Sequence, residues 1–165
     1  MRDLQEYGLK CMEMLDALAI PYGNVLEIVV NTRAGSRWGQ CRKIPSGYSI
    51  NINADLLNEK NAEEGLINTL LHELIHTCPN CMNHGEIWKN YAARVYRRYG
   101  YDVKRTSSAE DKGVVEKTVG RKEDYKYFCK CEKCGYVWKY KRMCDTVRYP
   151  GKYQHHGCGG KLVRA

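Results

Sequence analysis

The chain has 165 residues, of which 43% are hydrophobic, and it carries a formal net charge of +8. No apolar run reaches the roughly 20 residues that a membrane helix needs, and the first residues lack the apolar segment of a signal peptide, so we expect a cytoplasmic protein with no membrane partner. The nine cysteines are then better interpreted as thiolate metal ligands than as disulfides.

The first part of the chain predicts a helix followed by a three-stranded sheet. Residues 3–19 place apolar side chains at helical spacing before Pro21, which is a stop signal. The apolar stripe consists of Leu4, Tyr7, Cys11, Leu15 and Leu18. The predicted strands run from Val25 to Asn31, from Arg37 to Lys43 and from Tyr48 to Asn53, with a hairpin turn at Pro45 to Gly47.

The strand sequences also predict positions in the sheet. The first strand is nearly all apolar and is expected at the centre. In the third strand, Ser49, Asn51 and Asn53 alternate with apolar residues, which predicts one wet and one buried face. Trp38 belongs either to the core or to the wall of a cleft. If a free sheet edge lies beside the site described next, an extended substrate chain could pair with it through backbone hydrogen bonds.

A His-Glu-x-x-His sequence occupies residues 72–76. On a helix, His72 and His76 lie on one face and can bind one metal ion, while Glu73 can reach a water on that metal. The signature of Asn61 and Glu64 predicts that this helix begins near Ala62. The helix is apolar almost all round, which predicts burial, and buried ionisable groups are rarely without a use.

His84 is the expected third ligand, because a catalytic zinc usually takes three protein ligands and keeps its fourth position for water. Pro79 should end the first helix, and Asn83 with Glu86 predicts the start of a second one. These signals place His84 in the first turn of the second helix. The alternative is that His84 is only a helix-start residue in a polar loop.

Cys78 and Cys81 form a Cys-x-x-Cys sequence that resembles a redox motif. Cys78, however, follows the C-terminus of a helix, where the helix dipole disfavours a thiolate. We therefore expect a tight turn that positions His84 and no redox chemistry.

The second helix should extend to residue 99, with Gly100 as its C-cap. Its inward-facing stripe is expected to consist of Trp88, Tyr91, Ala92, Val95 and Tyr99. Residues 101–122 lack periodicity and apolar content, which predicts a mobile linker. Residues 1–100 carry 11 basic and 11 acidic side chains, whereas residues 101–165 carry 16 basic and 8 acidic ones. The C-terminal part is therefore expected to bind a polyanion, with nucleic acid as the leading candidate.

Residues 123–165 contain two knuckles with the spacing of a zinc ribbon. Cys131 and Cys134 form the first knuckle, and His155 and Cys158 form the second one after 20 intervening residues. So short a segment cannot bury a sufficient core, so a structural zinc is expected to hold it folded. Three further residues compete for the ligand positions: Cys129, Cys144 and His156.

The strand between the knuckles alternates aromatic and basic residues. Aromatic rings can stack on unpaired bases and basic side chains can contact phosphates, so the strand is expected to bind single-stranded nucleic acid. The residues are Tyr136, Trp138 and Tyr140 on one face, with Lys139, Lys141 and Arg142 beside them. The alternative is that the rings cover the ribbon itself or dock it on another part of the chain.

The order of these motifs resembles the SprT family of zinc metalloproteases, the group that includes Spartan. The resemblance rests on HELIH at residues 72–76, HGEIWK at 84–89, SRWGQC at 36–41, ININ at 50–53 and the terminal ribbon. It implies an α+β, zincin-like core made of an N-terminal helix, a three-stranded sheet, the His-Glu-x-x-His helix and a third-ligand helix over residues 1–100, followed by a small β zinc ribbon. SprT ribbons usually have Cys where this chain has His155.

The resemblance also implies a function. We expect a zinc endopeptidase with two zinc ions, in which Glu73 is the general base. The expected substrates are proteins bound or crosslinked to DNA. Such a protein could associate with the nucleoid. The competing hypothesis is a non-enzymatic, zinc-containing nucleic-acid-binding protein. Glu73 discriminates between the two, because a structural site has no use for a carboxylate beside an open coordination position.

Overall fold

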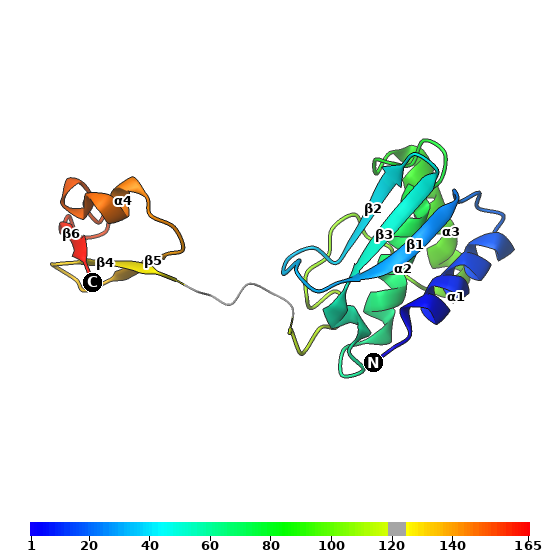
Figure 1. Ribbon diagram of the computed structural model, residues 1–165, viewed down its shortest axis with the longest axis horizontal. Coiled ribbons are helices and arrows are strands. Elements are labelled where there is room, and N and C mark those ends of the chain that lie inside the picture. The colour runs from blue at the N-terminus through cyan, green and yellow to red at the C-terminus, as the bar shows by residue number, and fades with distance from the viewer. Residues whose placement is uncertain (119–124) are drawn as a thin grey trace. The chain divides into compact units, whose positions relative to one another are not determined.

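The computed structural model describes residues 1–118 and 125–165, which belong to two compact units, Met1–Gly120 and Arg121–Ala165 (Figure 1). Residues 119–124, which include the end of the predicted linker and the first residues of the predicted ribbon segment, lie outside the described part. Each unit has its own small sheet, so the chain is of the mixed α+β class that the sequence predicts. No helix in the described residues is long and apolar enough to cross a membrane.

The first unit begins with helix α1 (Leu4–Ala17), close to its predicted bounds. The Asp3 side chain caps it by accepting hydrogen bonds from the backbone N–H groups of Gln5 and Glu6. Leu4, Cys11 and Leu15 of the predicted stripe are buried. The helix therefore serves to pack against the rest of the unit.

The sheet of this unit contains β1 (Val25–Asn31), β2 (Gly39–Ile44) and β3 (Gly47–Asn53) in the order β1-β3-β2. Strand β3 pairs with β1 in parallel and with β2 in antiparallel orientation, so the predicted hairpin is confirmed. The prediction of a central first strand is wrong, because β1 lies at an edge and its Leu26 and Val30 side chains are 49% and 42% exposed. Apolar content alone did not distinguish a central strand from a partly exposed edge strand.

Strand β3 is also more buried than its alternation predicts. Ser49 and Asn53 were expected to face water, yet each is only 1% exposed. Both find partners inside the fold: the Ser49 hydroxyl donates to Glu27 Oε1 at 2.6 Å, and Asn53 Nδ2 donates to the Ala34 carbonyl at 2.7 Å. Satisfied hydrogen bonds let polar side chains take buried positions in a central strand.

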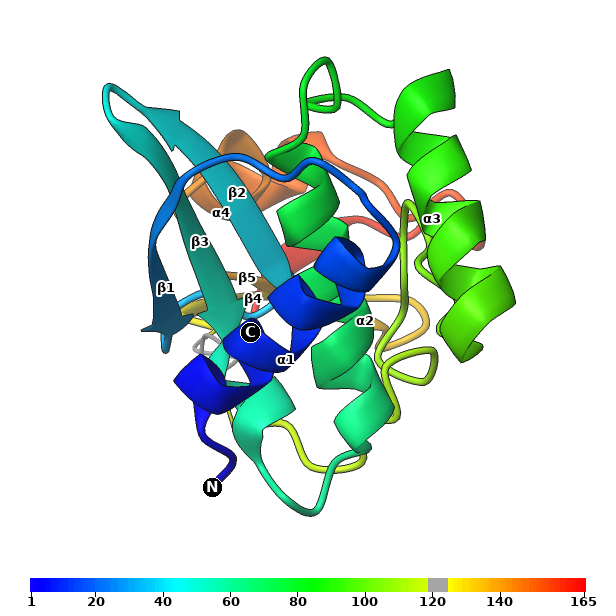
Figure 2. The same cartoon turned by 90° about the vertical axis from the view of Figure 1, so that its right-hand side faces the viewer.

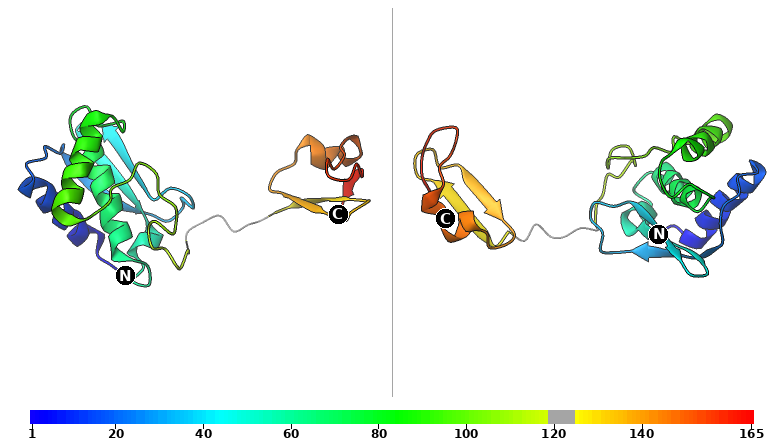
Figure 3. Two further views of the ribbon diagram at one scale, coloured as in Figure 1. Left: turned by 180° about the vertical axis from the view of Figure 1, so that it is seen from behind. Right: turned by 90° about the horizontal axis from the view of Figure 1, so that it is seen from above.

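After the short 3₁₀ helix η1 (Ala54–Leu57), helix α2 (Glu63–His76) crosses the unit and helix α3 (Glu86–Tyr99) follows it. Figures 2 and 3 show α1 and α2 on one face of the sheet, with α3 packed beside α2 on the side away from the strands. In the predicted inward stripe of α3, Trp88, Ala92 and Val95 are buried, while Tyr91 and Tyr99 are partly buried against the core. Gly100 ends the helix with a φ of +79°. Helix α2, buried on nearly all sides, is the centre of the unit.

The predicted mobile linker is corrected by the structure, since its residues 101–118, here called the strap, pack along the first unit. Buried Asn61 holds the strap: its Oδ1 accepts from the N–H groups of Val115 and Glu116, and its Nδ2 donates to the Glu116 carbonyl. The sequence position of Asn61 predicts that it caps α2, but its side chain holds the strap instead. Further along, Thr118 donates through its N–H and hydroxyl to Asp55 Oδ1.

The second unit is a small antiparallel sheet with irregular connections. Strands β4 (Tyr127–Cys131), β5 (Val137–Tyr140) and β6 (Leu162–Arg164) pair in the order β5-β4-β6, and the short helices α4 (Asp145–Arg148) and η2 (Pro150–Lys152) lie between the last two in sequence. Its described buried apolar residues are Cys129, Cys131, Val147 and Leu162. So small a core needs an additional crosslink to stay folded.

Candidate metal centres

Helix α2 and the loop before α3 bring three imidazoles together. The Nε2 atoms of His72, His76 and His84 form a triangle with sides of 3.1, 3.2 and 3.1 Å. Tetrahedral zinc with Zn–N bonds of about 2.0–2.1 Å needs N···N separations of roughly 3.3 Å, so the three nitrogens fit one zinc ion. The geometry thus joins the three residues that the sequence spacing selects.

His84 reaches this position from a different local structure than predicted. Helix α3 begins at Glu86 with Gly85 as its N-cap, so His84 lies in the preceding loop and not in the first helical turn. Asn83 Oδ1 accepts from the Gly85 N–H at 3.1 Å, an Asx-type turn that replaces the predicted capping box. The side chain of Asn83 therefore shapes the loop that presents His84.

Backbone carbonyls orient two of the rings. Nδ1 of His72 lies 2.9 Å from the Lys104 carbonyl, and Nδ1 of His76 lies 2.6 Å from the Cys81 carbonyl. A carbonyl can only accept, so each Nδ1 carries the proton and each Nε2 presents its lone pair to the centre. The pKa of His72 is lowered to about 3, mainly by burial and to a smaller extent by the neighbouring His76 and His84. This imidazole is therefore neutral at physiological pH.

The turn after α2 explains why the Cys81 carbonyl is available to His76. Cys78 and Cys81 are buried free thiols, and burial raises the pKa of Cys78 to about 12. Neither thiol has the low pKa of a redox-active cysteine. The turn instead places the Cys81 carbonyl against His76.

Glu73 lies beside the imidazoles but faces the sheet. It is 6% exposed, and its carboxylate accepts a hydrogen bond from the backbone N–H of Cys41 in β2. Burial raises the pKa of Glu73 to about 7, against the opposing effects of this hydrogen bond and of the cations Lys112 and Arg37. A carboxyl group with a pKa near neutrality can both accept and return a proton at physiological pH.

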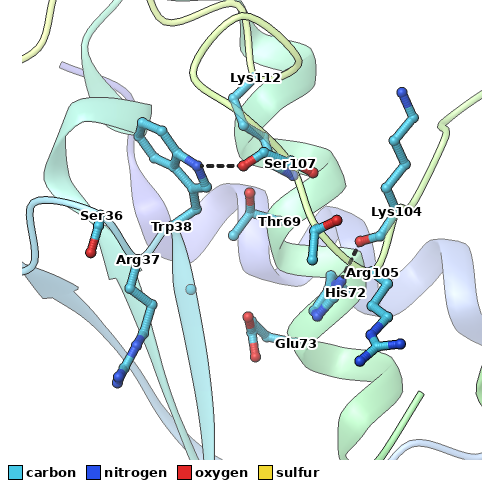
Figure 4. A pocket seen from close by; sticks show the side chains of 12 residues that line it. Ser36, Arg37, Trp38, Thr69, His72, Glu73, Lys104, Arg105, Ser107 and Lys112 are labelled. Atoms are coloured by element: carbon cyan, nitrogen blue, oxygen red, sulfur yellow. Dashed lines mark hydrogen bonds between the residues drawn. The ribbon is translucent and has the colours of Figure 1, made fainter. Parts of the chain in front are cut away.

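A cavity of about 260 Å³ opens beside His72 and Glu73, between the N-terminal end of β2 and the strap (Figure 4). Trp38 forms part of its wall and donates from Nε1 to the Ser107 carbonyl at 3.1 Å. The partly buried ring also packs against the hydrophobic core, so each of the two alternatives for this residue holds in part. The strap residues of this wall, Lys104 to Ser107 and Lys112, were missed from the sequence. Their low-complexity appearance gave no periodic signal that could have identified them.

The second unit contains the other cluster of metal-type donors. Cys131 Sγ lies 3.4 Å from Cys158 Sγ, and His155 Nδ1 lies 3.1 Å from Cys134 Sγ and 3.3 Å from Cys158 Sγ. Zn–S bonds of about 2.3 Å imply S···S separations of roughly 3.8 Å, so modest expansion would accommodate zinc. The donors are the four that preserve both knuckles.

The competing residues lie outside this cluster. Cys129 is buried and its thiol donates to the Thr146 carbonyl, while His156 is exposed. Although burial raises the pKa of Cys131, hydrogen bonds from the Cys134 backbone and from Cys158 outweigh it and bring the pKa to about 6. A thiol with this pKa supplies the thiolate that zinc binds.

The predicted aromatic surface is split in two. Tyr136 and Trp138 contact each other with ring centroids 4.7 Å apart, and both rings contact His155 at 5.6 and 5.0 Å. The Lys139 and Lys141 ammonium groups lie over the Tyr125 ring instead. Tyr136 nevertheless stays 58% exposed, beside a cavity of about 410 Å³.

A cluster of three imidazoles and a second cluster of thiols and imidazole make the chain a candidate metalloprotein with two centres, both of which suit zinc. Comparison with family models gives a match to the SprT-like family over residues 15–107, more than half of the chain. The chain therefore belongs to the SprT-like family, which is associated with metallopeptidase activity. A search of curated proteins finds no match.

Proposed function

We propose that the protein is a zinc-dependent endopeptidase with a zincin-like catalytic core. The observation that carries the proposal is the triangle of His72, His76 and His84 Nε2 atoms, with the Glu73 carboxylate beside it at the edge of a sheet. A zinc ion held by the three nitrogens would polarise the scissile carbonyl and acidify a water molecule. Glu73 accepts the proton of that water and returns it to the leaving amine.

Strand β2 offers a backbone edge for the substrate. The Asn53 N–H donates to the Trp38 carbonyl, so the backbone groups of Trp38 point toward β3. In an antiparallel pair, successive residues point their N–H and C=O groups alternately toward and away from the partner strand. The backbone groups of Gly39, Cys41 and Lys43 therefore point away from β3. The Cys41 N–H already contacts Glu73, which shows that this edge faces the site. Backbone pairing with β2 would carry an extended peptide past Glu73, and this pairing does not itself select a sequence.

The proposal is tested with Glu73→Gln, which removes the base but keeps the side-chain volume. We expect loss of peptide cleavage with unchanged zinc content, and the exposed Glu64 of the same helix gives the control variant Glu64→Gln with normal cleavage. Equal turnover by Glu73→Gln and the wild type would refute the general-base role. It would favour the alternative of a non-enzymatic nucleic-acid-binding protein.

The second part of the proposal concerns the substrates, which we infer to be proteins bound or crosslinked to DNA. Support comes from the excess of basic residues after residue 100 and from the exposed Tyr136 ring, which directly precedes β5, with Lys139 on that strand and Lys141 and Arg142 just after it. Single-stranded DNA is the expected ligand, since stacking requires unpaired bases. Arg142, Lys139 and Lys141 are exposed and would contact phosphates.

This inference is tested in the full chain with the double variant Lys139→Glu/Lys141→Glu, with Lys161→Glu in the same unit as the control. We expect weaker binding of a single-stranded oligonucleotide, a smaller dependence of affinity on salt and loss of DNA-stimulated cleavage. Binding and stimulation that match the control would remove the DNA role from this surface.

A further inference from the structure

The cavity beside His72 and Glu73 has a strongly positive lining. Its charged residues are Glu73 and four cations: Arg37, Lys104, Arg105 and Lys112. The Lys104 ammonium group is paired with Asp102 and Asp111 at 3.4 and 3.3 Å. The remaining cations outnumber Glu73, so the cavity favours an anionic group.

Lys112 differs from the other three cations in its burial. It is 6% exposed, and its side chain has no hydrogen bond or ion pair with any residue in the described ranges 1–118 and 125–165. Burial lowers the pKa of Lys112 to about 8, against the attraction of Glu73 and Asp111, so the side chain is still mainly protonated at neutral pH. The Lys112 ammonium group lines the cavity and has no acceptor on the described part of the chain, so it is available to bind an anionic group that enters the cavity.

The strap holds Lys112 firmly in place. The N–H of Lys112 donates to the Ala109 carbonyl at 3.2 Å, and the Gly113 N–H donates to the Glu110 carbonyl at 2.9 Å. The Lys112 backbone also lies directly on α2, because a Cβ at Gly65 would come within 2.1 Å of the Lys112 carbonyl oxygen. The backbone that carries Lys112 is therefore fixed against α2, so the side chain starts from a defined point of the wall.

Hydroxyl groups complete the lining around Lys112. Ser36, Thr69, Thr106 and Ser107 all contribute to the cavity. Figure 4 shows Thr69 between Lys112 and the pair of His72 and Glu73. The Thr69 hydroxyl already donates to the Gly65 carbonyl at 2.7 Å, which leaves the hydroxyl groups of Ser36, Thr106 and Ser107 as donors. A carboxylate accepts hydrogen bonds from both ammonium and hydroxyl groups, so these donors suit it.

We propose that Lys112 determines substrate specificity by binding the carboxylate of an aspartate or glutamate side chain next to the scissile bond. The proposal rests on the proposed peptidase function, because the peptide paired with β2 is what carries this side chain past the cavity. The cavity volume of about 260 Å³ lies below the roughly 300–1,000 Å³ of pockets for drug-sized ligands, which suits one side chain.

The test measures peptide binding, so that it does not depend on turnover. Zinc-loaded full-length Glu73→Gln is titrated against fluorescein-labelled peptides that are identical except for Glu, Gln or Lys at each position next to the scissile bond. At one position we expect the Glu peptide to bind about tenfold more tightly than the Gln peptide, as one charge-assisted hydrogen bond would produce. Adding Lys112→Met should abolish this preference, and adding Lys112→Glu should reverse it in favour of the Lys peptide.

The control is Lys89→Met, which removes an exposed lysine of α3 that pairs with Glu86. Its preference for the Glu peptide should be unchanged. Equal affinity for Glu and Gln peptides at every position, or a preference that survives Lys112→Met, would overturn the proposal. Displacement of the Glu peptide by a short oligonucleotide in a Lys112-dependent manner would also overturn it, because the cavity would then bind phosphate. Failure of the peptidase function is seen separately, as absence of cleavage by the wild type.

Discussion

Replacing Asn61 by alanine should strongly destabilise the first unit. The Asn61 side chain is 2% exposed and makes four hydrogen bonds at 2.7–2.9 Å, to the carbonyls of Asp55 and Glu116 and to the N–H groups of Val115 and Glu116. A hydrogen bond contributes about 1 kcal/mol net, and buried groups left without partners cost more, so we expect a loss of roughly 4 kcal/mol in unfolding free energy.

Urea unfolding followed by far-ultraviolet circular dichroism measures this loss, because the long helices of the chain all belong to the first unit. Asn90→Ala, at an exposed position of α3, is the matched control and should change stability by less than about 0.5 kcal/mol. Hydrogen exchange should also accelerate at the Val115 and Glu116 amides. A loss below about 1 kcal/mol for Asn61→Ala would show that the strap contributes little, and would refute this account of how it is held.

Three further predictions concern the two centres. Gly39→Val should abolish cleavage without loss of zinc, because a Cβ at Gly39 would lie 2.5 Å from Glu73 Oε1; metal analysis and a peptide assay check both effects. In metal-stripped protein, burial raises the pKa of Glu73 from 4.5 to about 7, so the native state holds an extra proton between these values and its stability falls as pH rises through them. The unfolding free energy of Glu73→Gln, measured by urea titration, should therefore rise by roughly 3 kcal/mol relative to that of the wild type between about pH 4 and about pH 8. A difference in unfolding free energy that does not change with pH would contradict this prediction. Cys134→Ser should lower the zinc content by about one ion per chain and unfold the second unit, seen as loss of dispersed NMR signals, while peptide cleavage persists.

The sequence was sufficient to predict which side chains gather in the two candidate clusters, because much of each cluster depends on local spacing. The four-residue step from His72 to His76 becomes one helical turn wherever the helix forms. The two knuckles of the ribbon likewise carry their own turns, so Cys131, Cys134, His155 and Cys158 could be selected before the structure was known. Which His155 nitrogen faces the cluster could not be predicted, since Nδ1 and Nε2 differ only in how the ring is oriented.

Long-range contacts were harder to predict. Asn61 followed by Glu64 satisfies the pattern of a helix cap. The Asn61 side-chain amide can equally form hydrogen bonds with the backbone of a distant segment, as it does with Val115 and Glu116. Nothing in the local sequence distinguishes these two roles. The position of β1 at the sheet edge depends on which strand pairs with both of the others, and the central strand β3 has more polar residues than β1. These errors share one cause, because each depends on a partner distant in the chain.

The prediction of a mobile linker in place of the strap is the error with the greatest consequence for the candidate site. A segment of polar and charged residues without periodicity is typical of a linker, and its own side chains bury little: Val103 and Lys112 are its buried residues in the described part of the chain. Its order comes instead from acceptors and donors on the core, namely Asn61, Asp55 and Trp38. The Lys104 carbonyl is then fixed against His72 Nδ1, so the tautomer of a metal-type imidazole depends on a segment that lies beyond the helix carrying it. It follows that loosening the strap should weaken zinc binding at the first centre, and that Asn61→Ala should lower zinc affinity as well as stability.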